Sequence, residues 1–142
     1  MASAKSEVRA LLDRQSAAMQ AKDIDQLMPV YSPDVVYFDT VSPLQFAGHA
    51  ALRRRFVEWF DMWKGPIGLE VRDMEIVASG DLAVAHWFNR ASGTMRSGLD
   101  VGSWVRVTNC AQRSDRGWLV THEHVSWPVD PASRIAATDL VP

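Results

Sequence analysis

The spacing of apolar residues changes near residue 65, and this change constrains the fold more than any other feature. Across 4–22 and 49–63 the apolar residues recur every three or four positions, as on one face of a helix. From residue 67 onward they recur mainly at every second position, as in a strand with one buried face. Helices followed by a run of strands are typical of an α+β layer fold. We therefore predict one domain, 1–142, in which a curved antiparallel sheet wraps around N-terminal helices and leaves a cavity between them.

The boundaries of the helices follow from local signals. The first helix is expected over 4–22, and Gln15 is an amide inside its apolar stripe. A short second helix begins at Asp23, whose side chain can cap the first turn. The third helix, about 49–63, carries Arg53, Arg54 and Arg55 next to acidic residues, and we expect this charged cluster to face solvent.

The strands are expected at 35–39, 67–78, 82–91, 99–110 and 117–127. Within 67–78 the apolar positions change parity, which is the pattern that a β-bulge near Asp73 produces. In the strand 82–91, either Ala83, Ala85, Trp87 and Asn89 face the interior, or Leu82, Val84, His86 and Phe88 do. We favour the first set, because small residues leave room for a cavity that Trp87 and Asn89 would line.

Composition excludes several classes of protein. The chain is 47% hydrophobic and 23% charged, with a formal net charge of −2, so neither nucleic acid nor an anionic membrane is an expected partner. No apolar run is long enough to span a bilayer, and the first residues lack the hydrophobic core of a signal peptide, so we expect a cytoplasmic protein. The single cysteine, Cys110, excludes an internal disulfide and a cysteine-based zinc cluster. The six tryptophans favour an aromatic cavity, a buried interface, or both.

Asp39 ends the extended run that begins at Val35, and alternation places it on the same face as Val35 and Tyr37. A carboxylate at the end of an apolar face loses water, which raises its proton affinity, as the function of an enzymatic base requires. The alternative is that Asp39 only opens the turn at 40–43.

The last strand carries His122, His124 and Ser126 on one face and Thr121, Glu123 and Val125 on the other. Burying neutral imidazoles costs less than burying a carboxylate without a partner, so we expect the two histidines and the serine to face the interior. The alternative places them on an exposed or dimer-covered face. A metal site would need a third ligand, for which Asp39 or His86 are the candidates. We predict neither a metal nor a cofactor.

The chain resembles the superfamily that includes nuclear transport factor 2, ketosteroid isomerase and SnoaL-type polyketide cyclases. The resemblance covers nearly the whole chain, and the motifs that carry it are Asp23-Ile-Asp-Gln-Leu, Tyr31-Ser-Pro-Asp-Val-Val-Tyr-Phe-Asp39, Phe46-Ala-Gly48, Gly80-Asp-Leu-Ala83, Gly117-Trp118 and His124-Val-Ser126-Trp-Pro128. It implies a cone-shaped α+β barrel. It also implies homodimers that pair through the outer face of the sheet, for which Trp104, Arg106 and Trp118 are candidates.

The resemblance further implies a site. Asp39 matches the aspartate that acts as the base in ketosteroid isomerase, and Gln15 and Ser103 occupy the positions of that enzyme's oxyanion hole. His124 and Ser126 match positions that line the family's pocket. His122 adds a polar group, and Tyr37, Trp59 and Trp87 would supply apolar walls.

These observations favour a cofactor-independent acid/base enzyme of the isomerase, cyclase or lyase type. It would act on a hydrophobic small molecule, with Asp39 as base and His124 orienting it or stabilising an oxyanion. One alternative is a non-catalytic ligand-binding or dimerisation module of the same fold. Another is an epoxide hydrolase-type enzyme, which is disfavoured because the sequence shows no clear inward-facing arginine.

Overall fold

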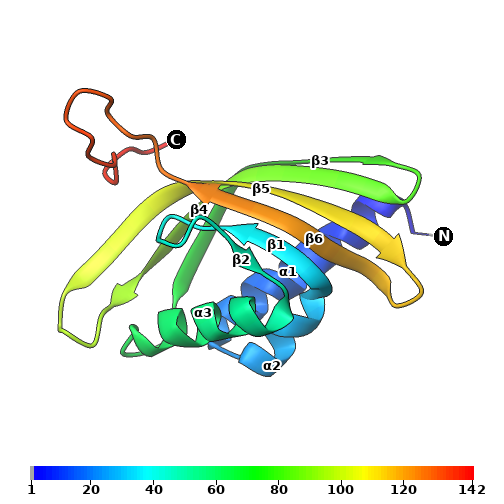
Figure 1. Ribbon diagram of the computed structural model, residues 1–142, viewed down its shortest axis with the longest axis horizontal. Coiled ribbons are helices and arrows are strands. Elements are labelled where there is room, and N and C mark those ends of the chain that lie inside the picture. Colours follow the sequence, from blue (N-terminus) through cyan, green and yellow to red (C-terminus); the bar gives the residue numbers. More distant parts are fainter. Residues whose placement is uncertain (1) are drawn as a thin grey trace.

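The computed structural model describes residues 2–142 and shows helices packed against one side of a curved sheet (Figure 1). The helical segments are α1 (Ala4–Ala21), α2 (Ile24–Leu27), the 3-10 turn η1 (Met28–Val30) and α3 (His49–Asp61). The strands are β1 (Tyr31–Phe38), β2 (Phe46–Ala47), β3 (Gly68–Ser79), β4 (Leu82–Thr94), β5 (Asp100–Ser114) and β6 (Gly117–Ser126). The predicted α+β class is confirmed, and the predicted helices and strands occur in the expected order, but the two-residue strand β2 was not predicted.

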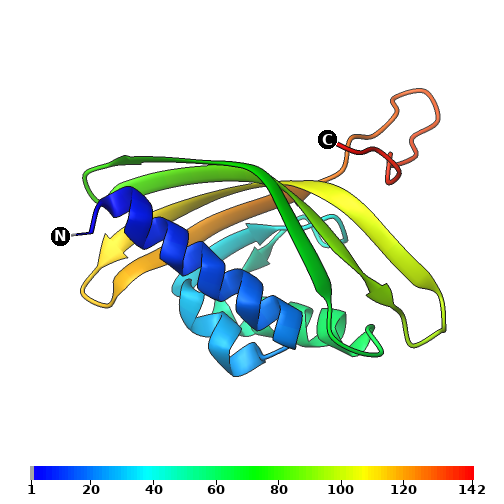
Figure 2. The ribbon, with the colours of Figure 1, turned by 180° about the vertical axis from the view of Figure 1, so that it is seen from behind.

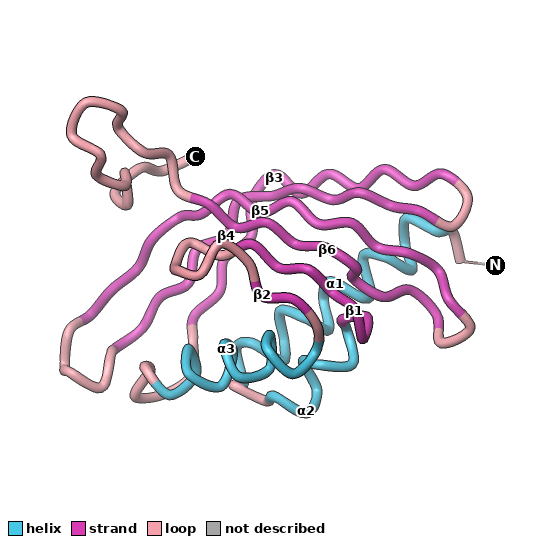
Figure 3. The backbone as a smooth tube through the Cα atoms, in the orientation of Figure 1, coloured by secondary structure: helices cyan, strands magenta, loops and turns pink. Residues whose placement is uncertain are grey.

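One six-stranded sheet contains every strand, in the order β2-β1-β6-β5-β4-β3 (Figure 3). Strands β3 to β6 pair antiparallel with their neighbours in the chain, whereas β1 pairs parallel with β6. The parallel pairing brings the end of β1 beside the middle of β6, because Tyr37 lies opposite Glu123 and Phe38 opposite His124. The parallel pairing therefore brings Tyr37 and Glu123, which lie far apart in the sequence, side by side.

Helix α1 lies along the concave side of the sheet (Figure 2). Its first turn is capped by Ser3, whose side chain accepts a hydrogen bond from the amide of Ser6, and it ends at Lys22 in the left-handed conformation. Its buried face consists of Val8, Leu11, Leu12, Gln15 and Ala18. The helix thus carries an amide, Gln15, into the core.

The bulge predicted near Asp73 is confirmed. The register between β3 and β4 shifts between Arg72 and Glu75, and Asp73 has a φ of 55°. Asp is among the residues that tolerate this left-handed conformation best, so the sequence supplies a suitable residue where the strand bends.

The face of β4 that was predicted to point to the interior does so. Ala83, Ala85 and Trp87 are buried, whereas Val84 and Phe88, on the opposite face, are 45% and 36% exposed. Ala83 and Ala85 belong to the packed core, whereas Trp87 and Asn89 line the cavity between the helices and the sheet.

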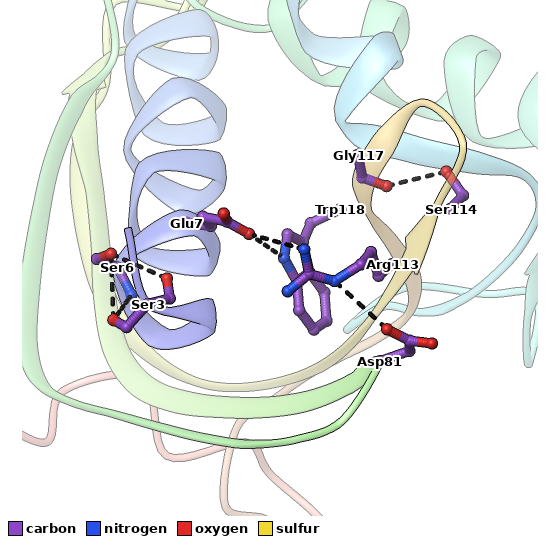
Figure 4. A network of polar contacts seen from close by, with 8 residues as sticks. All are labelled: Ser3, Ser6, Glu7, Asp81, Arg113, Ser114, Gly117 and Trp118. Carbon is purple, nitrogen blue, oxygen red and sulfur yellow. Dashed lines mark hydrogen bonds and ion pairs between the residues drawn. The ribbon is translucent and has the colours of Figure 1, made fainter. Parts of the chain in front are cut away.

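A polar cluster fastens the start of α1 to the ends of β5 and β6 (Figure 4). The indole of Trp118 donates to Glu7 across 2.7 Å, and the guanidinium of Arg113 lies over the Trp118 ring, 3.4 Å from both Glu7 and Asp81. Trp118 is 6% exposed, so the prediction that it lies on an outer dimerisation surface is wrong. Its indole packs against α1 instead.

The segment after β6 leaves the sheet and forms a loop beside it (Figure 1). A β-bridge between Val129 and Ala136 closes this loop, and Ser103 accepts from the indole of Trp127 and donates to the carbonyl of Thr138. Within residues 2–142, none of the helices combines the length and the apolar character needed to cross a membrane.

Candidate functional site

A cavity of ≈ 300 Å³ lies between the helices and the concave face of the sheet. Most of its wall is apolar. The aromatic residues that line it are Tyr37, Phe56, Trp59, Trp63, Trp87 and Trp127. Polar groups are few and include two carboxyl groups, Asp39 and Glu123, and one arginine, Arg55. This composition is typical of a small-molecule site, in which apolar walls supply affinity and a few polar groups fix orientation.

Six of the site residues predicted from the sequence line this cavity. They are Gln15, Tyr37, Asp39, Trp59, Trp87 and Ser103. They come from α1, from β1 and the residue after it, from α3, and from β4 and β5. The concave side of the sheet thus brings together residues from both halves of the chain.

Asp39 follows β1 and forms an ion pair with Arg55 of α3, whose Nε lies 2.8 Å from its Oδ2. Its Oδ1 accepts from the amide of Thr40 across 2.7 Å, so the carboxylate is also part of the turn. The side chains of Asp39 and Arg55 are only 12% and 13% exposed. The turn and the cavity interpretations of Asp39 therefore describe the same conformation.

The expectation that the arginine cluster of the third helix faces solvent is wrong for one member. Arg53 and Arg54 are exposed, whereas Arg55 lines the cavity. It directly precedes the buried Phe56, and the apolar face of α3 is broad enough for Arg55 to lie at its edge. A long side chain at such an edge can reach inward.

The predicted orientation of β6 is also wrong. Glu123 is buried and lines the cavity, whereas His122, His124 and Ser126 point to the other face of the sheet and do not line it. There, the rings of His122 and His124 pack against Phe38 with centroids 4.7 and 5.3 Å apart. The prediction failed because it assumed that Glu123 has no partner inside, and the structure supplies several.

Glu123 is 2% exposed and accepts hydrogen bonds from three elements. The amide of Gln15 donates across 2.7 Å, that of Asn109 across 3.3 Å, and the hydroxyl of Tyr31 across 3.4 Å. Burial raises the pKa of Glu123 above its ordinary value of 4.5, and these hydrogen bonds lower it by less. Because these three donors are all neutral groups, none of them offsets the loss of water with a positive charge.

The two tyrosines beside Glu123 remain hydrogen-bond donors. Burial, together with the nearby Glu123 carboxylate, raises the pKa of Tyr31 and of Tyr37 well above the ordinary value of 10.0. Tyr37 lines the cavity, so its hydroxyl is a proton-bearing group next to a buried acid.

Gln15 and Ser103, which we expected from the sequence to form an oxyanion hole, already have protein partners. The Nε2 of Gln15 donates both to Tyr31 and to Glu123, at 2.7 Å in each case. The hydroxyl of Ser103 donates to the carbonyl of Thr138 across 3.1 Å. Both residues line the cavity, but their donor groups form hydrogen bonds with other residues of the protein.

Sequence reasoning missed Glu123 and Arg55 as cavity residues. One signal for Glu123 was available, since Gln15 interrupts an apolar helical stripe and a buried amide needs a polar partner. Within residues 2–142, no three side chains of the His, Cys, Asp and Glu types lie close enough together to hold a metal ion.

Comparison with known proteins places the chain in a family. The family model described as a SnoaL-like domain matches residues 8–130. A crystal structure of an NTF2-like protein of unknown function from Pseudomonas putida KT2440 is 35% identical, with a TM-score of 0.89 over 98% of this chain and 96% of that one. No curated protein matches the chain.

More distant structures share the fold. An NTF2-like superfamily protein from Salmonella enterica is 16% identical, with a TM-score of 0.79 over 89% of this chain and 92% of that one. A ketosteroid isomerase-like protein from Erwinia carotovora is also 16% identical, with a TM-score of 0.76 over 89% and 97%. The chain therefore belongs to the SnoaL-like domain family of the NTF2-like superfamily.

Proposed function

We propose that this protein is a cofactor-independent acid/base enzyme for a hydrophobic small molecule, of the isomerase, cyclase or lyase type. The observation that carries the proposal is the pair of carboxyl groups in one aromatic cavity with opposite surroundings. Asp39 lies against the guanidinium of Arg55, whereas Glu123 is buried among neutral donors. Two acids whose environments differ in this way are suited to different roles in proton transfer.

Asp39, as the carboxylate of an ion pair, is the base in this proposal. It takes a proton from carbon or from water at the edge of the cavity. Glu123, whose pKa is raised by burial, holds a proton at neutral pH more readily than an exposed glutamate does. It supplies a proton, directly or through the hydroxyl of Tyr37, at another position of the bound molecule.

Exchange of a carbon-bound proton with D2O tests this function without knowledge of the natural substrate. The protein would be incubated with apolar ketones such as 2-tetralone, and loss of the α-proton signal followed by NMR. We expect exchange to be faster than in buffer and to fall at least about 100-fold in Asp39→Asn, the lower range for loss of a catalytic base.

The matched control is Asp115→Asn, in the turn between β5 and β6, where the aspartate is exposed. We expect this variant to exchange the proton as fast as the native protein. Undiminished exchange by Asp39→Asn would exclude Asp39 as the base.

A non-catalytic ligand-binding protein is the second candidate. It is favoured by the donors of Gln15 and Ser103, which are engaged by the protein itself. A compound that binds in the cavity and is recovered chemically unchanged, with no proton exchange, would support this candidate over the enzyme.

The epoxide hydrolase-type alternative requires an arginine between two acids. The cavity does contain an inward arginine, contrary to the expectation from the sequence. Its hydrogen bond goes to Asp39, whereas Glu123 is held by Gln15, Tyr31 and Asn109. These contacts do not form an acid–arginine–acid relay, so we do not favour this reaction.

We also propose that two copies pair through the outer face of the sheet. The side chains of Val77, Leu82, Val84 and Phe88 are 70%, 58%, 45% and 36% exposed. Val77 on β3 lies opposite Val84 on β4, and Leu82 and Phe88 lie on the same face of β4 as Val84. An apolar patch of this kind on a sheet is favoured at protein interfaces.

A further inference from the structure

Arg55 is the cationic group of the cavity wall, and only part of its hydrogen-bonding capacity is used. Its Nε donates to Asp39 across 2.8 Å. Among residues 2–142, no protein acceptor is found for its two terminal nitrogens. A guanidinium carries several N–H donors in a fixed plane, and the terminal nitrogens of Arg55 are not among the fully buried polar atoms, so a ligand can reach them. The cavity therefore offers a ligand a row of oriented donors.

The position of the Arg55 side chain is fixed by its hydrogen bond to Asp39. Asp39, which accepts from its Nε, is itself held by the amide of Thr40 at 2.7 Å and by the hydroxyl of Thr40 at 3.3 Å. This arrangement limits the rotation of the guanidinium, so its remaining edge keeps one direction. Arg53, by contrast, forms a long 3.5 Å contact with Asp25 in which both side chains are more than half exposed.

The charges in the cavity are compatible with an anionic ligand. Asp39 is offset by Arg55, and burial raises the pKa of Glu123, which favours its neutral, protonated form. A planar guanidinium with a free edge matches a carboxylate, because both oxygens can accept parallel N–H bonds.

The size and chemistry of the remaining wall define the rest of the ligand. The cavity volume of ≈ 300 Å³ is at the small end of ligand sites, which span about 300–1,000 Å³. Trp59, Trp63, Trp87 and Trp127 contribute ring surfaces to the wall, so a flat, apolar body is favoured.

We propose that the cavity binds an organic acid with a compact aromatic or polycyclic body, and that Arg55 binds its carboxylate. This inference rests on the part of the proposed function that makes the cavity a small-molecule site. It does not require catalysis, and it assigns a substrate class to the site.

Isothermal titration calorimetry with two matched probes tests the inference. Naphthalene-2-carboxylate carries the charge, and naphthalene-2-carboxamide has nearly the same shape without it. We expect the native protein to bind the acid at least about tenfold more tightly than the amide, which is the scale of one charge-assisted hydrogen-bonded pair. We expect Arg55→Gln to abolish this preference and to leave the affinity for the amide unchanged.

Arg54→Gln is the matched control, because it removes the same charge from the neighbouring, exposed residue of α3. We expect it to bind both probes as the native protein does. Should Arg55→Gln not fold, which circular dichroism would show, Arg55→Lys replaces it. That variant keeps the charge but lacks the planar fork, and we expect it to retain only part of the preference for the acid.

Any of four results would overturn the inference. The native protein fails to bind the acid, or it binds both probes equally. Arg55→Gln weakens the binding of both probes alike, or Arg54→Gln lowers the affinity for the acid as much as Arg55→Gln does. Because the measurement is of equilibrium binding, it can succeed where the proton-exchange assay fails. Failure of the inference and failure of the proposed enzyme function therefore remain distinguishable.

Discussion

Gln15 on α1 donates a 2.7 Å hydrogen bond to Glu123 on β6, joining residues that are 108 positions apart in the chain. The same amide donates to the hydroxyl of Tyr31 at 2.7 Å. One side chain thus connects the helix layer to the sheet at the inner wall of the cavity, beside a carboxyl group that has lost nearly all contact with water. The two residues that join these layers, Gln15 and Glu123, also line the cavity.

Glu123 should make stability fall as the pH rises. The pKa of Glu123 in the folded chain lies above its ordinary value of 4.5. At pH values between the unfolded and the folded pKa, the folded state therefore keeps a proton that the unfolded state has released. The free energy of unfolding therefore decreases through this window, by at most about 1.4 kcal/mol per pH unit, and is not recovered above the folded pKa. Glu123→Gln should lack this decrease.

Urea unfolding at a series of pH values above about 4, the ordinary pKa of a glutamate, would measure this decrease in the free energy of unfolding. Glu58→Gln, at an exposed position of α3, is the matched control and should follow the native pH dependence. A difference between Glu123→Gln and the native protein that stays constant with pH would contradict the prediction.

Gln15→Leu should destabilise the protein by about 1–3 kcal/mol, because it leaves the Glu123 carboxyl group and the Tyr31 hydroxyl with fewer partners while keeping a side chain of similar size. Gln20→Leu, at an exposed position on the same helix, should have little effect. Chemical unfolding of both variants checks the prediction, and equal losses would show that the buried network contributes nothing specific.

Trp118→Phe should destabilise the protein by about 1 kcal/mol or more, since it removes the N–H that bonds Glu7 as well as some ring surface. Neither Trp118 nor Glu7 lines the cavity, so affinity for a cavity ligand should not change. Trp104→Phe is a suitable comparison, because the Trp104 ring contacts Arg72 instead. A loss of ligand affinity in Trp118→Phe would show that the cluster and the cavity are coupled.

Val84→Lys should convert the proposed dimer into a monomer, because it places a charge in the apolar patch on the outer face of β3 and β4. Sedimentation equilibrium would detect the change in mass. Val129→Lys, which changes another exposed valine outside the sheet, should leave the dimer intact. A native protein that sediments as a monomer would remove the basis for this pairing.

The sequence determined the elements and their order, because apolar periodicity is a local property. Helical spacing in α1 and α3, alternation along β4, and the change of parity near Asp73 each predict one element from its own residues. Asp39 and Tyr37 were also predictable as cavity residues, since alternation along β1 places them on one face with Val35, and that face is buried.

The tertiary structure alone decided which polar residues face the cavity. The orientation of β6 depends on whether a buried carboxyl group finds partners. Two of those partners come from α1 and β1, far away in the chain, and the third comes from the adjacent strand β5. Likewise, Arg55 faces inward because Asp39, on another element, accepts its hydrogen bond. The free energy of burying a charge or an amide depends on its surroundings in space, and periodicity along one strand or helix does not contain them.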